Sequence, residues 1–261
     1  DLRFRAIQNN NKIEDFRLDL QIKNCIKHSD QIICVSNQTK SDLIKYYSVD
    51  EKKIKVIYHG ADHIDEIKEA TLNYEKKHIM NRYKINREFL LTVGYTHKHK
   101  NIVSVINCLD NLVKDGNDLD LVIVGPQGND EENIQEKINN LNLTNRIIRI
   151  PYAESQFLGY LYYFSKLFIY PSMYEGFGFP ILEAMRSGGV VLGSNAGSIP
   201  EIGGNAMELF NINEPDELTV KAKRIIADKK RREVLRLRGY ERARNFMWEK
   251  TAKKTIQSLQ I

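Results

Sequence analysis

The chain has 261 residues, 42% of them hydrophobic, which is enough for one large domain or two smaller ones and excludes a disordered chain. Its three cysteines, Cys25, Cys34 and Cys108, form no C-x-x-C pair, which disfavours a disulfide scaffold or structural zinc site and favours a reduced, cytoplasmic protein. The net charge of +5 is accompanied by no visible signal peptide, no nucleic-acid motif and no apolar run near the roughly 20 residues that cross a bilayer.

Strand-like and helix-like segments alternate along the chain, which predicts an α/β fold with a parallel sheet. In the first part, helices are expected over 14–28, 38–47 and 74–83, and strands over 31–36 and 53–60. Strands follow at 89–95, 119–128, 146–152, 166–172 and 188–195, with helices at 101–114, 130–141 and 154–165 between them. Helices at 215–227, 229–245 and 247–260 are expected to close the chain.

Local signals refine these elements. Ser36 or Asn37 suits the N-cap of the second helix. Residues 61–87 are polar and charged, which predicts a linker around the third helix. The aromatic segment 157–164 is too short to span a membrane and is interpreted as a buried helix face.

Basic residues gather towards the C-terminal end. Residues 221–254 hold 14 Lys or Arg against 4 Asp or Glu, a local charge of +10 that leaves −5 for the rest of the chain. Such a segment is either a solvated face of the terminal helices or a peripheral site for anionic lipid or phosphate groups. Nucleic acid is disfavoured, because the basic residues are not interleaved with exposed-looking aromatic residues.

Three strand exits carry residues that suit a ligand, and ligands bind parallel α/β sheets at the carboxyl ends of the strands. Gly94 and Gly125 each follow an apolar strand directly. A glycine there lets the backbone approach a ligand or adopt a positive φ, although an ordinary strand-to-loop glycine fits as well. Lys100 precedes a helix, where it can pair with a phosphate at the helix N-terminus or lie on the surface.

The third exit, YPSMYEGFGFP at 170–180, carries the strongest signal. Gly176 and Gly178 alternate with Glu175 and aromatic residues, and Pro180 suits the first turn of a helix that stops at the following pair of glycines. The amides around Gly178 and Phe179 are expected to point towards a bound anion.

Two glutamates flank this turn. We expect Glu183 on the first helical turn, where a carboxylate either stabilises the helix or accepts hydrogen bonds from a ribose diol. Glu175 precedes the helix, closer to the reacting end of a ligand. The spacing of the two glutamates is similar to that of an acid–base pair of carboxylates. The intervening glycines suit binding and charge stabilisation equally well.

Three weaker motifs have structural interpretations. The sequence S-I-P-E at 198–201 is a capping-box pattern in which Glu201 either only caps its own helix or also faces a ligand at this second helix start. Asp118-Leu119-Asp120 has the spelling of a D-x-D metal motif but leads into a strand, so we interpret it as a loop. His59 and His63 lie near the predicted domain junction, where a structural role is expected.

The combined motifs resemble the retaining GT-B glycosyltransferases that carry the E-x7-E signature, and most of all the bacterial mannosyltransferase-like enzymes of surface polysaccharide assembly. The resemblance rests on DQIICVSNQTKSDLIKYYSVDEKKIKVIYHG (30–60), LLTVGYTHKHKNI (90–102), LVIVGP (121–126), FIYPSMYEGFGFPILEAMRSGGVVLGSNAGSIPE (168–201) and FMWEKTA (246–252). It implies a Rossmann-like C-terminal nucleotide-sugar domain over 63–245, the tail end of a second Rossmann-like, acceptor-side domain over 1–62, and a helix at 246–261 that crosses back to it.

The resemblance also implies a reaction. A nucleotide sugar, such as GDP-mannose or a UDP-sugar, would pass its sugar to an acceptor hydroxyl with retention and without a metal or further cofactor. Lys100 would neutralise the diphosphate, Glu183 would bind the ribose and Glu175 would lie beside the sugar, with Glu175 and Lys100 as the catalytic pair. The residues expected to bind the donor are Gly94, His99, Lys100, Gly125, Tyr152, Glu175, Gly176, Phe177, Gly178, Phe179 and Glu183.

Two departures from the family pattern matter. The family usually has an arginine beside the lysine, whereas this chain has His99, which would make a weaker, pH-dependent phosphate contact. Family members also have a longer N-terminal domain with an acceptor pocket, so this chain would bind donor better than it catalyses transfer.

Other functions therefore stay open. The chain could be a donor-binding subunit or degenerate homologue that needs a partner chain. A dehydrogenase is disfavoured, because no G-x-G-x-x-G follows a strand. The acceptor is expected to be a saccharide or a lipid-linked molecule, with possible peripheral contact to the inner face of an anionic membrane.

Overall fold

The computed structural model describes residues 2–6, 12–67 and 72–259, and it has the α/β fold with parallel strands that the sequence predicts. A two-stranded parallel sheet pairs β1 (Ile32–Cys34) with β2 (Ile54–Val56). A six-stranded parallel sheet has the order β5-β4-β3-β6-β7-β8. Its strands are β3 (Glu88–Val93), β4 (Leu119–Val124), β5 (Ile147–Ile150), β6 (Leu167–Tyr170), β7 (Val191–Ser194) and β8 (Glu208–Phe210).

Helices alternate with these strands, as right-handed crossovers between parallel strands require. In the first part they are α1 (Arg3–Ala6), α2 (Lys12–His28), α3 (Asn37–Tyr47) and α4 (Leu72–Tyr83). Around the larger sheet lie α5 (Ile102–Lys114), α6 (Glu131–Asn140), α7 (Ser155–Phe164), α8 (Phe179–Arg186) and α9 (Ile199–Gly203). The chain closes with α10 (Pro215–Ala227), α11 (Lys229–Ala243) and α12 (Trp248–Leu259).

Both faces of the large sheet are buried, which explains its continuous apolar strands. Alternate residues of β3 point to opposite faces: Phe89 and Leu91 join the core under α4, α7 and α8, whereas Leu90 joins the core under α5, α6 and α10. The aromatic segment of α7 is a buried helix face, as predicted, since Phe157, Leu161 and Tyr162 lie inside the first of these cores.

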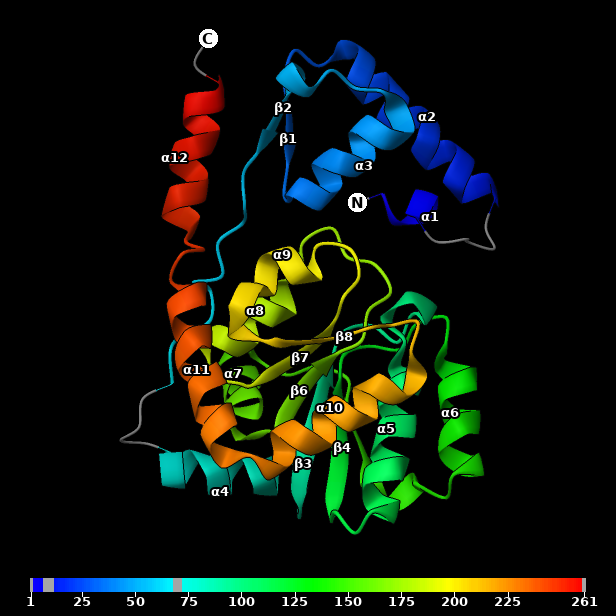
Figure 1. Ribbon diagram of the computed structural model, residues 1–261, viewed down its shortest axis with the longest axis vertical. Helices are drawn as coiled ribbons and strands as arrows, with labels where there is room; N and C mark the ends of the chain where they lie inside the picture. The colour runs from blue at the N-terminus through cyan, green and yellow to red at the C-terminus, as the bar shows by residue number, and fades with distance from the viewer. Residues whose placement is uncertain (1, 7–11, 68–71, 260–261) are drawn as a thin grey trace.

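Figure 1 shows two bodies connected by the extended segment that follows β2. We call residues 2–6 and 12–56, which contain α1 to α3 and the small sheet, the N-terminal unit, and residues 72–243 the C-terminal unit. The N-terminal unit lies over the edge of the large sheet at which α8 and α9 begin, and α12 runs alongside the segment after β2 (Figure 1). The predicted domain boundaries at 62/63 and 245/246 stay a prediction.

Several sequence expectations need correction. Strand β8 and helix α1, of three and four residues, were not predicted. The D-x-D spelling is not a loop: Leu119 and Asp120 open β4, and Asp120 is buried against Arg87 at 3.0 Å. Part of the predicted linker, 68–71, and the last residue of the expected 247–260 helix lie outside the described residues.

The basic C-terminal segment is largely engaged in internal bonds. Arg224 and Arg231 both bind the buried Glu208 carboxylate, at 2.8 Å and 2.7 Å. Arg242 donates to the carbonyls of α9, and Arg244 forms an ion pair with Glu66 at 3.1 Å. These contacts give no support to a lipid-binding face. Within the described ranges, no helix is both long and apolar enough to cross a membrane.

Candidate functional site

A glycine directly follows each of the neighbouring strands β3 and β4, and the backbones of the two glycines lie close together. Gly94 and Gly125 have φ values of 140° and 134°, which side chains rarely tolerate. A Cβ on Gly125 would lie 2.3 Å from the carbonyl oxygen of Gly94, so that position needs glycine on steric grounds as well. At Gly94 the neighbouring space holds the aliphatic part of Lys100, whose Cε would lie 3.6 Å from a Cβ at that position. The close approach of the two strand ends therefore depends on Gly125, and the side chain of Lys100 lies beside Gly94.

Lys100 and Glu175 form an ion pair at this place. Lys100 ends a 3₁₀ turn (Lys98–Lys100), and its Nζ lies 2.6 Å from Oε1 of Glu175 and 3.3 Å from the hydroxyl oxygen of Tyr170. The two charged side chains are 17% and 12% exposed, so they are shielded but can be reached from solvent. Tyr170 is the last residue of β6 and is fully buried; burial raises its pKa well above the ordinary value, so the hydroxyl stays neutral.

The loop that carries Glu175 is held by Ser198, the residue directly before α9. Ser198 donates from its amide to the carbonyl of Glu175 at 3.2 Å, and its hydroxyl lies 3.0 Å and 2.8 Å from the carbonyls of Glu175 and Phe177. The loop ends at Gly178, the N-cap of α8, with φ 99°. Pro180 lies in the first turn of α8, as predicted, so the amide end of this helix follows the glutamate loop directly.

His99 lies beside Lys100 but is not a cation. Nη1 of Arg3 lies 2.9 Å from Nε2 of His99. Burial, together with the positive charges of Arg3 and Lys100, lowers the pKa of His99 to about 3. A cationic, pH-dependent phosphate contact from His99 therefore has no support in this structure, and the guanidinium of Arg3, a residue that sequence reasoning passed over, lies at that place.

Glu183 belongs to a second cluster. It is the fifth residue of α8 and lies beyond the first turn, contrary to the sequence expectation. One carboxylate oxygen lies 2.9 Å from Nε2 of His63, and the other accepts from the hydroxyl of Tyr162 at 3.1 Å. The hydrogen bond to Glu183 raises the pKa of His63. Glu183 is 15% exposed, and the bonds to His63 and Tyr162 use one acceptor position on each of its two oxygens.

Aromatic residues of the predicted donor motif pack at the junction between the units. The ring of His59 stacks on Phe179 with centroids 5.0 Å apart, and Phe177 meets both rings edge-on. Trp248 of α12 stacks on Phe179 at 6.3 Å. His59 therefore has the structural position that was expected of it. Tyr152, predicted near the base, follows β5, the edge strand that β4 and β3 separate from β6. Its side chain is exposed, at 78%.

Glu201 does not cap its own helix. The Ser198 side chain makes no capping bond to α9. Glu201 instead accepts from the amides of Asn37 and Gln38, at 2.8 Å and 3.1 Å, and from the hydroxyl of Tyr58 at 2.8 Å. These amides open helix α3 of the N-terminal unit, so the carboxylate lies at the positive end of a different helix. The capping-box prediction was wrong because a partner from the other unit competes for the carboxylate.

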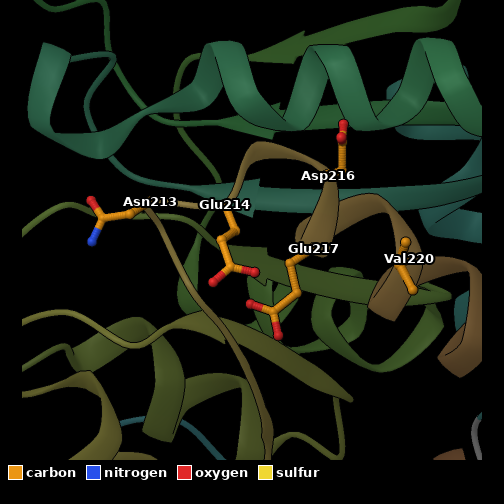
Figure 2. A pocket seen from close by; sticks show the side chains of 5 residues that line it. All are labelled: Asn213, Glu214, Asp216, Glu217 and Val220. Atoms are coloured by element: carbon orange, nitrogen blue, oxygen red, sulfur yellow. The ribbon is translucent and has the colours of Figure 1, made fainter.

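A hollow at the start of α10 is a poor place for an anion. Figure 2 shows that three carboxylate side chains, Glu214, Asp216 and Glu217, line it together with Asn213 and Val220. It lies beside β8, which is separated from β6 by β7 in the sheet. Among the residues that the structure describes, no group of three or more His, Cys, Asp or Glu side chains could hold a metal ion.

The structure thus joins Gly94, Gly125, Lys100 and Glu175 at one place, and gives Glu183 a separate set of partners. Tyr170 and Tyr162 were not predicted as site residues, because an aromatic residue in an apolar segment is typical of a hydrophobic core. The position of Tyr170 at the end of a strand, directly before the glutamate loop, is the one signal that could have drawn attention to it.

Comparison with known proteins agrees with the motifs. Residues 74–242 match the family described as glycosyl transferases group 1, and residues 4–64 match glycosyltransferase family 4. The O-antigen chain mannosyltransferase B of Escherichia coli is 26% identical over 88% of this chain and 60% of its own length. The O-antigen chain mannosyltransferase RfbU of Salmonella typhimurium is 29% identical over 77% of this chain and 51% of its own length. The chain thus spans 60% or less of the length of these relatives.

Solved structures share the fold. Sucrose-phosphate synthase from Thermosynechococcus elongatus superposes with a TM-score of 0.83 at 19% identity, covering 99% of this chain and 64% of that one. HepE of Anabaena, solved in complex with UDP-glucose, has a TM-score of 0.79 at 17% identity, covering 95% of this chain and 68% of that one. At these identities the likeness concerns the fold, which is that of GT-B glycosyltransferases, as expected from the sequence. The family match covers more than half of the chain, so this protein belongs to the glycosyl transferases group 1.

Proposed function

We propose that the protein is a retaining, metal-independent glycosyltransferase that moves a hexose, such as mannose, from a nucleotide-diphosphate sugar to an acceptor hydroxyl. The observation that carries this proposal is the shielded Lys100–Glu175 ion pair at the exits of β3 and β6. Family membership and the mannosyltransferase relatives support the reaction class. Surface polysaccharide or glycoconjugate synthesis is the proposed setting.

Lys100 is the residue that we assign to the diphosphate. A cation is needed there because the leaving nucleotide diphosphate gains negative charge as its bond to the sugar breaks. The amide end of α8, which begins at Phe179 beside the glutamate loop, supplies further positive potential. Both groups are fixed before the ligand arrives, so little reorganisation is needed during the reaction.

Glu175 and Glu183 are assigned different parts of the donor. Glu175 is paired with Lys100 through one carboxylate oxygen, and the carboxylate is proposed to accept from a sugar hydroxyl. Glu183 is oriented by His63 and Tyr162, and we assign the ribose diol to its remaining acceptor positions. Gly94, Gly125, Gly176, Phe177, Gly178 and Tyr152 stay predicted donor contacts.

The proposed donor is GDP-mannose or a UDP-sugar, with no further cofactor. The name of the Escherichia coli relative favours mannose, whereas the Anabaena structure holds UDP-glucose. The proposed acceptor is a saccharide or a lipid-linked molecule at the cytoplasmic side.

Isothermal titration of the protein with GDP, UDP and ADP, and with their common sugar conjugates, tests the proposal. We expect micromolar binding of one nucleotide class, unchanged by EDTA, and a further gain in affinity for the matching nucleotide sugar. Lys100→Met should weaken this binding, while Lys98→Met, an exposed lysine in the same turn, should leave it unchanged.

Two results would count against parts of the proposal. Binding of no nucleotide would remove the donor-site assignment, and binding that EDTA abolishes would contradict metal independence. Donor binding without transfer to mannose-containing acceptors would favour the alternative, a donor-binding subunit that needs a partner chain.

A further inference from the structure

Helix α3 of the N-terminal unit holds the glutamate loop on both sides of Glu175. On one side, the hydroxyl of Tyr174 donates to Oδ2 of Asp42 at 2.5 Å. On the other side, the carbonyl of Gly176 accepts from the hydroxyl of Ser36 at 2.7 Å, and Thr39 reinforces this bond at 3.2 Å. The residues directly before and after Glu175 are therefore held by the opposite unit of the protein.

The polar groups in these contacts are shielded from solvent and hydrogen-bonded. Tyr174 and Asp42 are 4% and 5% exposed, and Ser36 is fully buried. The second oxygen of Asp42 accepts from the side-chain amide of Gln38 at 3.1 Å, so the buried carboxylate has a partner on each side. Removing the tyrosine hydroxyl would leave a buried acceptor without its partner, which is the costly way to lose a hydrogen bond. The bond is thus a specific restraint on the loop.

A further set of hydrogen bonds fixes the position of α3 on the C-terminal unit. The carboxylate of Glu201 receives the first amides of α3, and the loop carbonyl of Glu175 is bound by Ser198, three residues before Glu201. Helix α3 is therefore docked at its N-terminus by α9 and along its first two turns by the glutamate loop. Bonds within its own unit also hold the loop: they reach the backbone carbonyls of Ser172, Glu175 and Phe177, the amide of Met173 and the Glu175 side chain.

We infer that α3 is a positioning element for Glu175, with Asp42 and Ser36 as the positioning residues that set the sugar-binding geometry of that carboxylate from the opposite unit. The inference rests on the proposed function, because it assumes that Glu175 contacts the donor sugar. Its consequence is that the donor-sugar site is complete only while the two units are docked. Separation of the units would remove the restraints on Tyr174 and Gly176, while the bonds of the loop to Ser198 and Lys100 remain. Nucleotide binding through Lys100 is therefore expected to stay intact.

The matched pair of variants Tyr174→Phe and Tyr47→Phe tests this inference. Each removes one tyrosine hydroxyl bound to an aspartate: Tyr174 bonds across the units, whereas Tyr47 of α3 bonds to Asp19 at 2.7 Å within the N-terminal unit. Affinities for the nucleoside diphosphate and for its sugar conjugate are measured by calorimetry, and their ratio reports the sugar contact. Thermal unfolding of each variant verifies that it is folded.

The affinity ratio is the affinity for the sugar conjugate divided by that for the nucleoside diphosphate. We expect Tyr174→Phe to lower this ratio about tenfold, as Glu175→Gln should. The affinity of Tyr174→Phe for the nucleoside diphosphate should stay unchanged. Tyr47→Phe should keep the ratio. Asp42→Asn retains an acceptor for the tyrosine and should keep the ratio as well. Asp42→Leu removes that acceptor and should lower the ratio.

Each contrary outcome is informative. A ratio that falls for Glu175→Gln but not for Tyr174→Phe or Asp42→Leu overturns the inference and leaves the proposed function standing. Equal losses for Tyr174→Phe and Tyr47→Phe would mean general loosening and would also overturn it. A wild-type protein that gains nothing from the sugar overturns the proposed function and this inference together.

Discussion

Replacing Lys100 by methionine separates the structural from the ligand-binding role of the ion pair. The variant keeps the length of the side chain that lies over Gly94 but leaves Glu175 without its cation. Breaking a fully buried pair costs about 3–5 kcal/mol of folding free energy. With 17% and 12% of the side chains exposed, water reaches Glu175, and we expect a loss of about 2–3 kcal/mol.

The same variant should weaken nucleoside diphosphate binding independently of stability. A hydrogen bond to a charged group contributes about 1.5–3 kcal/mol, which corresponds to a Kd about 10- to 150-fold higher. Urea unfolding measures the first effect, and calorimetric titration with the nucleoside diphosphate measures the second.

The double variant Lys100→Met/Glu175→Gln distinguishes the two effects. It contains no unpaired charge, so most of the lost stability should return while nucleotide affinity remains well below that of the wild type. If Lys100→Met destabilises the protein but leaves the Kd for the diphosphate unchanged, the lysine is a structural partner of Glu175 and the assignment of the phosphate site is refuted.

Three further predictions concern other parts of the molecule. Gly125→Ala should lower the unfolding free energy by about 1–3 kcal/mol, because its Cβ collides with a backbone carbonyl, whereas Gly116→Ala, at an open positive-φ position, should cost less in the same urea titration. Pairing with Glu183 raises the pKa of His63, so its contribution is fully present below the unfolded pKa of about 6.5 and is lost as pH rises through the folded pKa; His63→Gln should flatten this part of a stability–pH curve, and an unchanged slope would contradict the pairing. Glu201→Ala should destabilise the docking of α3 by about 1–3 kcal/mol and expose residues 12–56 to protease first, with Glu201→Gln less affected; uniform cleavage of both units would argue against a docking role.

Local patterns were sufficient for most of the fold. The alternation of apolar strands with amphipathic helices predicted five of the strands of the large sheet, and the strand-exit glycines marked the edge at which Lys100 and Glu175 meet. The E-x7-E stretch identified the family, which the match over residues 74–242 confirms. These features could be predicted because each depends on neighbouring residues: periodicity, glycine φ and helix-start chemistry act over a few positions.

The partners of the charged side chains were decided by the tertiary structure. Glu201 was expected to cap its own helix but accepts from the amide of Gln38 in α3, 163 residues away. Glu183 pairs with His63 over 120 residues, and Tyr174 with Asp42 over 132. The sequence by itself determined five of the six strands of the large sheet and the loop that carries Glu175. The packing of the two units determined what those carboxylates touch, since side-chain hydrogen bonds depend on distances in space that local sequence does not encode.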